Sequence, residues 1–561
     1  MASIVGKKIN GETYYYLRTM ARVGGKPKMV GERYLGKAAD VEAAMAGATS
    51  LPDRTRHLGF GDVAATWSMI ERLQIAEIVD EAVGPRRGDA LASVGTYLAL
   101  STLNRVCAPR SKLAFSQWWE TVAGDHLVHL VPAATDHRRF WDAMDAISST
   151  QLQAIERRIV SSMVEEFAVD LSGLVLDMTN FATYIDSANP RAPIAQRGHA
   201  KQKRTDLRLV GLGLVVTRDG GIPLVSHAYA GDKPDVTQFP AMLDELVARF
   251  GVLGGGDEEL TLVFDAGQDS EDNQAKVAKS PLHFVGSLPP SEHPELLAIS
   301  KSRYEILDAE AFPGLSAFET RKVVLGADYR LIVTHSQNLH DKQRRGFAQT
   351  LAKAVRQLGE LQARLARGRT RKQRSGVEAE IAGILAPRWC ERVITWALTG
   401  GRPAEHRLTY AIDEAANAAL EDELFGKRVL FTDRDEWSIT EVVAAYRSQS
   451  HVEADFRQMK DHEVVGFSPM FHWTDSKIKV HVFYCVLALM VARLMVREAE
   501  HAGISMSVRE LLSSLGGIQE TVLLYPSTGG RPRARRMLTE MGPAQLRLYE
   551  LFGLEVYAPR T

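Results

Sequence analysis

The stretch from residue 171 to 288 constrains the fold most, because apolar segments and helical segments alternate in it in a fixed order. Five segments have the apolar pattern of buried strands, namely Leu171–Phe181, Leu207–Thr217, Ile222–Tyr229, Leu260–Phe264 and His283–Leu288. Val236–Phe250 and Ser270–Lys279 have helical patterns between the later strands. The order β-β-β-α-β-α-β predicts a mixed sheet, and ligands gather at the strand ends of such sheets.

Two acids follow the apolar runs of the first and the fourth of these strands. Asp177 comes directly after Leu174, Val175 and Leu176, and Asp265 comes directly after Leu260–Phe264. In a sheet of this order the first and fourth strands are neighbours, so the two carboxylates are expected side by side. An Asp at the end of a strand is more often a cap or turn residue, so neither acid is diagnostic alone.

A third acid lies on the segment Tyr446–Lys460 (YRSQSHVEADFRQMK), which is predicted to be one amphipathic helix. Val452, Phe456 and Met459 form its apolar face. The adjoining polar stripe has steps of three or four residues and consists of Tyr446, Gln449, Glu453, Arg457 and Lys460. Taken alone, such a stripe is more often a solvated face with charge pairs. Packed on the sheet, the helix brings Glu453 to the two aspartates.

Three carboxylates within a few ångströms repel one another unless a cation neutralises them. Hard oxygen ligands select Mg²⁺ or Mn²⁺. Two such ions roughly 3.5–4 Å apart activate a water or a 3′-hydroxyl and stabilise the leaving oxygen of a phosphodiester. Asp177, Asp265 and Glu453 together therefore predict in-line phosphoryl transfer on nucleic acid, with two Mg²⁺ (or Mn²⁺) ions per active site.

The chain resembles a family, the DDE transposases of bacterial insertion sequences, in the insertion-sequence-four type with the Y-R-E-K signature. Tyr446, Glu453 and Lys460 are in register with that signature. Gln449 stands where the family usually has Arg, with Arg447 and Arg457 close by. The segments LVLDMTNF, RGHAKQKRTDLRLVGLGLVV and LTLVFDAGQDSEDN also resemble the family's segments around its first Asp, second strand and second Asp.

The resemblance implies an α/β fold with an RNase H-like catalytic core, built on a mixed five-stranded sheet with helices. It implies that a β-rich insertion domain with a helical hairpin interrupts this core, and that a β-hairpin and a helical N-terminal domain precede it. The domain boundaries we expect are 1–55 (basic β unit), 56–168 (helical DNA-binding or dimerisation domain), 169–290 (core, first part), 291–430 (insertion), 431–500 (core, second part) and 501–561 (helical tail).

The resemblance also implies roles for single residues. Asp177, Asp265 and Glu453 are the expected catalytic metal ligands. The expected DNA contacts are Tyr446, Arg447, Gln449, Arg457, Lys460, Lys201 and Arg204. Enzymes of this family bind the terminal inverted repeats of the element, cut there, and join the freed 3′-hydroxyl to target DNA. The implied partners are therefore double-stranded DNA, from the element ends and the target, and a second copy of the chain in a synaptic complex.

Two local basic patches stand out in a chain whose net charge is only −1. Residues 1–37 hold eight Lys or Arg against two Glu, interleaved with tyrosines. The stretch Asp341–Gly376, part of a predicted helical hairpin, holds eleven Lys or Arg against two acids. Both patterns suit contact with a phosphate backbone. A merely solvated, charged surface is an equally good interpretation of each.

Composition indicates a soluble protein of a reducing cytosol, and the resemblance implies the bacterial cytoplasm and association with the nucleoid. The three cysteines are far apart and form no metal motif, which fits a reducing compartment. No signal peptide is evident, and the longest apolar run, Val480–Ala492, is too short to span a bilayer and is predicted to be a buried helix. No membrane partner is therefore expected.

Two alternatives to a transposase stay open. One is a nuclease or resolvase with the same fold that cuts DNA without joining strands. The other is a domesticated or inactive copy that only binds DNA, which the unusual Gln449 keeps open.

Overall fold

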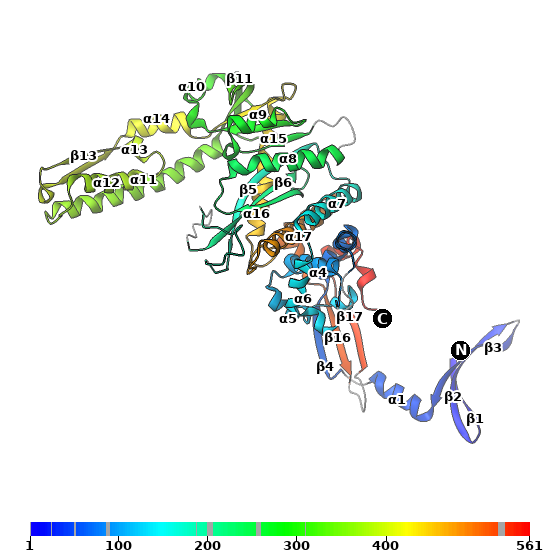
Figure 1. Cartoon of the computed structure of the whole chain (residues 1–561). Helices are drawn as coiled ribbons and strands as arrows, with labels where there is room; N and C mark the ends of the chain where they lie inside the picture. The colour runs from blue at the N-terminus through cyan, green and yellow to red at the C-terminus, as the bar shows by residue number, and fades with distance from the viewer. Residues whose placement is uncertain are drawn as a thin grey trace.

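The computed structural model describes residues 2–23, 25–49, 52–85, 90–186, 188–198, 206–253, 260–308, 310–525 and 533–560. A central mixed sheet organises them, and it contains the predicted order of strands (Figure 1). Its nine strands are β5 (Gly173–Thr183), β6 (Arg208–Thr217), β7 (Pro223–Ala230), β8 (Thr261–Val263), β9 (His283–Leu288), β10 (Glu305–Ile306), β11 (Leu315–Val324), β12 (Ala327–Ser336) and β15 (Lys427–Thr432). Their order across the sheet is β10-β11-β12-β15-β9-β8-β5-β6-β7.

The sheet is larger than the five strands that we expected. β5 pairs in parallel with β8 and antiparallel with β6, so the first and fourth strands of the core are neighbours, as predicted. β15 then pairs antiparallel with β9, and β12 with β15. The strands of residues 291–430 therefore continue the core sheet, because the open edge of β9 has unpaired backbone groups that another strand satisfies.

Helices cover both faces of the sheet. Gly213 of β6, which pairs with Met178, lies against Met242 of α8 (Asp235–Leu253). The next residue of β5, Thr179, accepts a hydrogen bond from Lys460, which directly follows α16 (Gln449–Met459). Because successive side chains of a strand point to opposite faces, α8 and α16 lie on opposite sides of the sheet. α9 (Glu271–Val277) connects β8 and β9 and packs against α8.

Only part of the insertion projects from the sheet. An arm extends away from the body in Figure 1. Its elements are α11 (Gln337–Ala366), α12 (Arg374–Leu385), α13 (Cys390–Val393), β13 (Ile394–Thr399), β14 (Arg407–Ile412) and α14 (Glu414–Leu424). The buried stripe on α11 that packs the arm consists of Phe347, Leu351, Ala354, Leu358, Leu361 and Leu365. The short α10 (Pro294–Leu297) precedes the arm at the edge of the sheet.

The helical domain and the C-terminal segment form a joint body. The helices of the first are α2 (Gly61–Arg72), α3 (Ile75–Val83), α4 (Val94–Cys107), α5 (Lys112–Trp119), α6 (His137–Asp145) and α7 (Ser149–Phe167). The C-terminal segment was expected to be helical throughout, and this was wrong. Besides α18 (Val508–Gly516) and α19 (Pro543–Leu551) it contains β16 (Gln519–Tyr525) and β17 (Arg533–Leu538). β16 pairs with β17 on one side and with β4 (Arg54–Gly59) on the other, so these strands form a three-stranded sheet.

The N-terminal β unit lies at the opposite end of the molecule from the arm (Figure 1). It is a three-stranded antiparallel sheet rather than the expected hairpin, with β1 (Ala2–Ile9), β2 (Glu12–Val23) and β3 (Lys26–Lys37) in that order. α1 (Ala38–Thr49) leads from it towards β4. Tyr14, Tyr16 and Tyr34 cluster on one side of the sheet.

One helix of the described chain, α17 (Asp475–His501), is long and apolar enough to cross a bilayer by length and composition. In the structure 89% of its apolar window is buried, so it is the core helix that the sequence predicted. It contacts α16, and Arg493 of α17 forms an ion pair with Asp455 of α16.

Arg105 of α4 ties the helical domain to the loop between α16 and α17. Its side chain is only 1% exposed. It donates to the carbonyl oxygens of Gly466 (3.3 Å), Ser468 (2.9 Å) and Arg110 (3.0 Å). Because buried carbonyls without a donor are costly, this guanidinium stabilises the loop between α16 and α17.

We therefore expect Arg105→Ala to lower the free energy of unfolding by about 3 kcal/mol, because it leaves a cavity and unpaired carbonyls. Urea unfolding followed by tryptophan fluorescence measures the change. Arg110→Ala is the matched control, since the side chain of Arg110 is exposed and only its backbone accepts from Arg105. Equal effects of the two substitutions would contradict this role of Arg105.

Candidate active site

The sequence predicted that Asp177 stands at the end of a strand. In the structure Asp177 lies inside β5. The strand continues to Thr183, because residues 177–183 keep their pairing with β6, in which Asp177 is opposite Leu214. The backbone N–H of Met178 donates to Asp177 Oδ1 at 2.7 Å. Asp177 and Thr179 are two residues apart, so both side chains are on the face of the sheet that α16 covers.

Asp265 lies two residues beyond the end of β8. The parallel register pairs Gly173 with Thr261 and Val175 with Val263. Two residues further along each strand, Asp177 and Asp265 stand at the same level of the sheet. The parallel pairing thus brings the two predicted acids to neighbouring positions.

A hydrogen-bond network holds the Asp265 carboxylate. Ser287 Oγ on β9 donates to Asp265 Oδ1 at 2.7 Å, and Tyr446 Oη donates to the same oxygen at 3.0 Å. Arg428 Nη1 on β15 donates to Tyr446 Oη at 2.9 Å. Burial, and next the charge of Asp265, raise the pKa of Tyr446 to about 12, so its hydroxyl keeps the proton that it donates.

The predicted single helix Tyr446–Lys460 is two helices. α15 (Ile439–Arg447) and α16 meet at Ser448, whose N–H bonds to Ala445 O at 3.1 Å instead of continuing one regular ladder. The helical spacing of apolar residues in the sequence is the same before and after Ser448. The sequence pattern therefore did not reveal the break. The break places Tyr446 and Glu453 on different helices.

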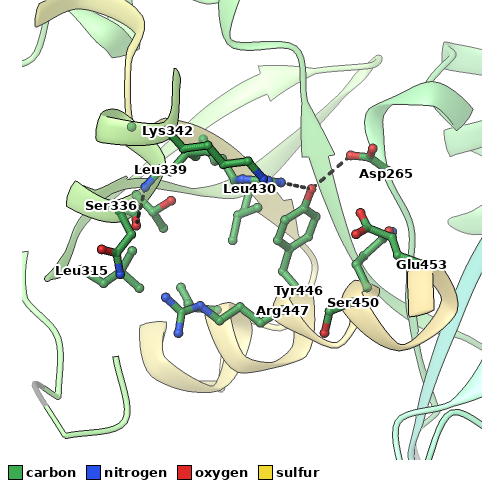
Figure 2. A pocket seen from close by; sticks show the side chains of 16 residues that line it. Asp265, Leu315, Ser336, Leu339, Lys342, Leu430, Tyr446, Arg447, Ser450 and Glu453 are labelled. Atoms are coloured by element: carbon green, nitrogen blue, oxygen red, sulfur yellow. Dashed lines mark hydrogen bonds between the residues drawn. The ribbon is translucent and has the colours of Figure 1, made fainter. Parts of the chain in front are cut away.

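A cavity of about 440 Å³ joins these groups. It is lined by Asp265, Tyr446 and Glu453, together with Arg428, Arg447 and Gln449. Figure 2 shows Asp265 and Glu453 at the same end of this cavity, beside the ring of Tyr446. Glu453 is exposed and lies on α16, which packs on β5. One cavity therefore contains one carboxylate from the sheet, one from the helix, and two guanidinium groups.

The predicted DNA contacts lie in different surroundings. Tyr446 is only 7% exposed and is engaged with Asp265. Gln449 is buried, and its Nε2 has no hydrogen-bond partner among the described residues. The guanidinium of Arg447 lies 4.6 Å from the ring centroid of Phe312. Arg457 is exposed, whereas Lys460 donates to Thr179 Oγ1 at 3.1 Å, on the same face of β5 as Asp177. Lys201 and Arg204 lie outside the described residues.

Three residues of this site were missed in the sequence. Arg428 and Ser287 belong to strands with ordinary patterns, and nothing local marks them. Asp269 follows Asp265 by four residues, and this spacing was the only available signal. Both of its carboxylate oxygens are buried without a hydrogen-bond partner among the described residues. Burial, and then the charges of Asp265 and Glu292, raise the pKa of Asp269 to about 8.

The donor chemistry fits a hard divalent cation. Carboxylate oxygens are the ligands that Mg²⁺ and Mn²⁺ prefer, and Asp177, Asp265 and Glu453 supply only such oxygens. Within the part of the chain that the structure describes, no three His, Cys, Asp or Glu side chains already stand together as a metal site.

The fold and the site define a mixed α/β protein with a large mixed sheet and with acids at neighbouring positions of two adjoining strands. Residues 170–491, more than half of the chain, match the family model described as the transposase DDE domain. The chain belongs to this family. The matched range spans the core sheet, the arm and most of α17.

Comparisons with individual proteins are more distant. No curated protein matches the chain. A cryo-EM structure of the piggyBac transposase synaptic complex with hairpin DNA covers 83% of this chain and 82% of that chain, at 9% sequence identity and a TM-score of 0.35. This likeness is too remote to support a structural argument.

The network around Asp265 predicts energetic coupling between Tyr446 and Arg428. In a double-mutant cycle, Tyr446→Phe and Arg428→Met should show a coupling of about 1 kcal/mol in the free energy of unfolding, because each removes the same hydrogen bond. Urea unfolding of the four proteins measures it. Arg447→Met serves as the control partner, since its guanidinium lies against Phe312, and its effect should add to that of Tyr446→Phe. Additive effects in both cycles would show that Tyr446 is not held by Arg428.

Proposed function

We propose that the protein is an active transposase that binds the terminal inverted repeats of an insertion sequence and catalyses metal-dependent cleavage and strand transfer. The observation that supports this best is the parallel register of β5 and β8, which sets Asp177 and Asp265 at one level, next to the cavity that Glu453 lines. The insertion-sequence-four type remains part of this proposal. So do action on DNA in the bacterial cytoplasm and a paired state of two protomers that joins two ends.

Asp177, Asp265 and Glu453 are the proposed metal ligands. Bound Mg²⁺ or Mn²⁺ would supply Lewis-acid activation of an oxygen nucleophile and stabilisation of the leaving oxygen. Tyr446 has a positioning role in this proposal, because its hydroxyl fixes one oxygen of Asp265 and leaves the other for a ligand. Lys460 lies beside β5 at Thr179, where its ammonium is placed to attract a phosphate.

Arg428 takes the place of the guanidinium that the family signature has at position 449. It lines the same cavity as Gln449 but comes from β15, and it bonds to Tyr446. A cation beside the carboxylates offsets part of their repulsion before any metal binds. This arrangement favours an active enzyme over the inactive DNA-binding copy, although position 449 departs from the signature.

The three acids give the direct test. Asp177→Asn, Asp265→Asn and Glu453→Gln should each lower Mg²⁺-dependent cleavage of a duplex carrying the element's end by about a thousandfold or more, because each removes a charged ligand. Affinity for the same duplex, measured by fluorescence anisotropy, should change little. Asp232→Asn, at an exposed position away from the cavity, is the control and should cleave normally. Full cleavage by all three variants would overturn the proposal.

Strand joining separates the transposase from the nuclease alternative. Pre-cut end DNA with a free 3′-hydroxyl is incubated with a supercoiled plasmid and Mg²⁺. A transposase gives joined products that depend on Asp177, Asp265 and Glu453. Cleavage without any joined product would favour the nuclease, and binding without cleavage would favour the inactive copy.

A further inference from the structure

The N-terminal sheet of β1, β2 and β3 has no covered face. Among the side chains that the structure describes between residues 2 and 35, none is buried. Ile4, Val30 and Tyr34 are each more than half exposed. A small sheet is stable only when one face packs on something, and α1 leads away from this sheet (Figure 1). The sheet is therefore built to be covered by a partner.

The strand registers assign its charged residues to two faces, because residues opposite each other in an antiparallel pair share a face. Lys7 and Lys37 are both opposite Tyr14, and Arg18 is opposite Glu32. Side chains at even positions of β2 and their partners form what we call the paired face, with Lys7, Glu12, Arg18, Arg22, Glu32 and Lys37. Odd positions of β2 and their partners form the open face, with Lys8, Lys26, Lys28 and Arg33.

The two faces differ sharply in charge. Both acids of residues 1–37 lie on the paired face, where Glu32 pairs with Lys7 (2.6 Å) and Arg18 (3.0 Å), and Glu12 pairs with Lys37. The open face holds four exposed cations and no acid. None of these four cations forms an ion pair with a residue that the structure describes. Four cations without ion pairs on one face of the sheet attract an anionic partner.

We propose that the open face of this sheet binds the phosphate backbone of double-stranded DNA, an inference that rests on the proposed function. Lys8, Lys26, Lys28 and Arg33 would each contact a phosphate. The same face also carries Ile4, Tyr15 and Leu17, next to Gly6, Gly31 and Thr13. This sheet is therefore a DNA contact separate from the catalytic cavity, and its phosphate contacts do not depend on the DNA sequence.

Two arginines allow a matched test in the full-length protein. Arg33 is on the open face and Arg22 on the paired face; both are exposed, and neither forms an ion pair with a described residue. Arg33→Gln and Arg22→Gln therefore change the net charge of the same sheet equally. The probe is a labelled random-sequence duplex, and binding is measured by anisotropy over a series of salt concentrations. Circular dichroism confirms that both variants are folded.

Each phosphate contact contributes about 0.9 to the slope of log K against log salt concentration. Arg33→Gln should lower the magnitude of the slope by about 0.9, and the variant with Lys8, Lys26, Lys28 and Arg33 all changed to Gln should lower it by about 3.6. Arg22→Gln should leave the slope nearly unchanged. Equal slopes for Arg33→Gln and Arg22→Gln would overturn the inference, as would an altered oligomeric state of DNA-free Arg33→Gln, which would indicate a protein partner.

The outcome also distinguishes this inference from the proposed function. If the wild type binds DNA and cuts end DNA in an Asp177-dependent manner while both arginine variants bind like the wild type, only the role of the sheet fails. If the wild type binds no duplex at all, both proposals fail.

Discussion

The parallel pairing of β5 with β8 is the constraint on which the rest of the site depends. Three residue pairs fix the register, from Gly173–Thr261 to Val175–Val263. A slip by one residue would turn the Asp177 side chain to the α8 face, because side chains alternate along a strand. The buried apolar side chains of both strands oppose such a slip, since Leu174, Val175 and Leu262 are all fully buried. Packing in the core thus determines where the acids stand.

The break at Ser448 has a comparable effect on the helical side of the site. In one regular helix, the positions of Tyr446 and Glu453 relative to each other would be fixed by the helical repeat. With the break, α15 presents Tyr446 to Asp265, and α16, which packs on β5, presents Glu453 to the same cavity. The capping box of Ser438 and Glu441 fixes the start of α15. The Asp455–Arg493 pair anchors α16 to α17. Each half is therefore held by contacts of its own.

The sequence predicted local elements well and distant pairings poorly. The bounds of β9 were predicted to the residue, and Asp265 was placed correctly, because apolar runs followed by polar residues mark buried strands directly. The continuation of the sheet through β15 and β12 was not predicted. Neither was the pairing of β4 with β16, which joins residues more than four hundred positions apart. Such pairings depend on which backbone edge is left open after the local elements have formed, and no periodicity encodes that.

The same limit applies to the site. The sequence proposed the three acids because apolar runs and a helical stripe are local patterns, whereas Arg428 and Ser287 act on Asp265 only through the tertiary fold. The basic stretch Asp341–Gly376 shows the opposite error. Several of its cations form ion pairs, as Arg364 of α11 and Lys372 do with Glu380 and as Arg374 does with Glu378 within α12, so sequence counting overstated its charge. Net local charge predicts an anionic partner only when the fold leaves the cations unpaired. On the N-terminal sheet the two faces separate paired cations from unpaired ones, and this is why its charge carries more weight than the larger surplus on the arm.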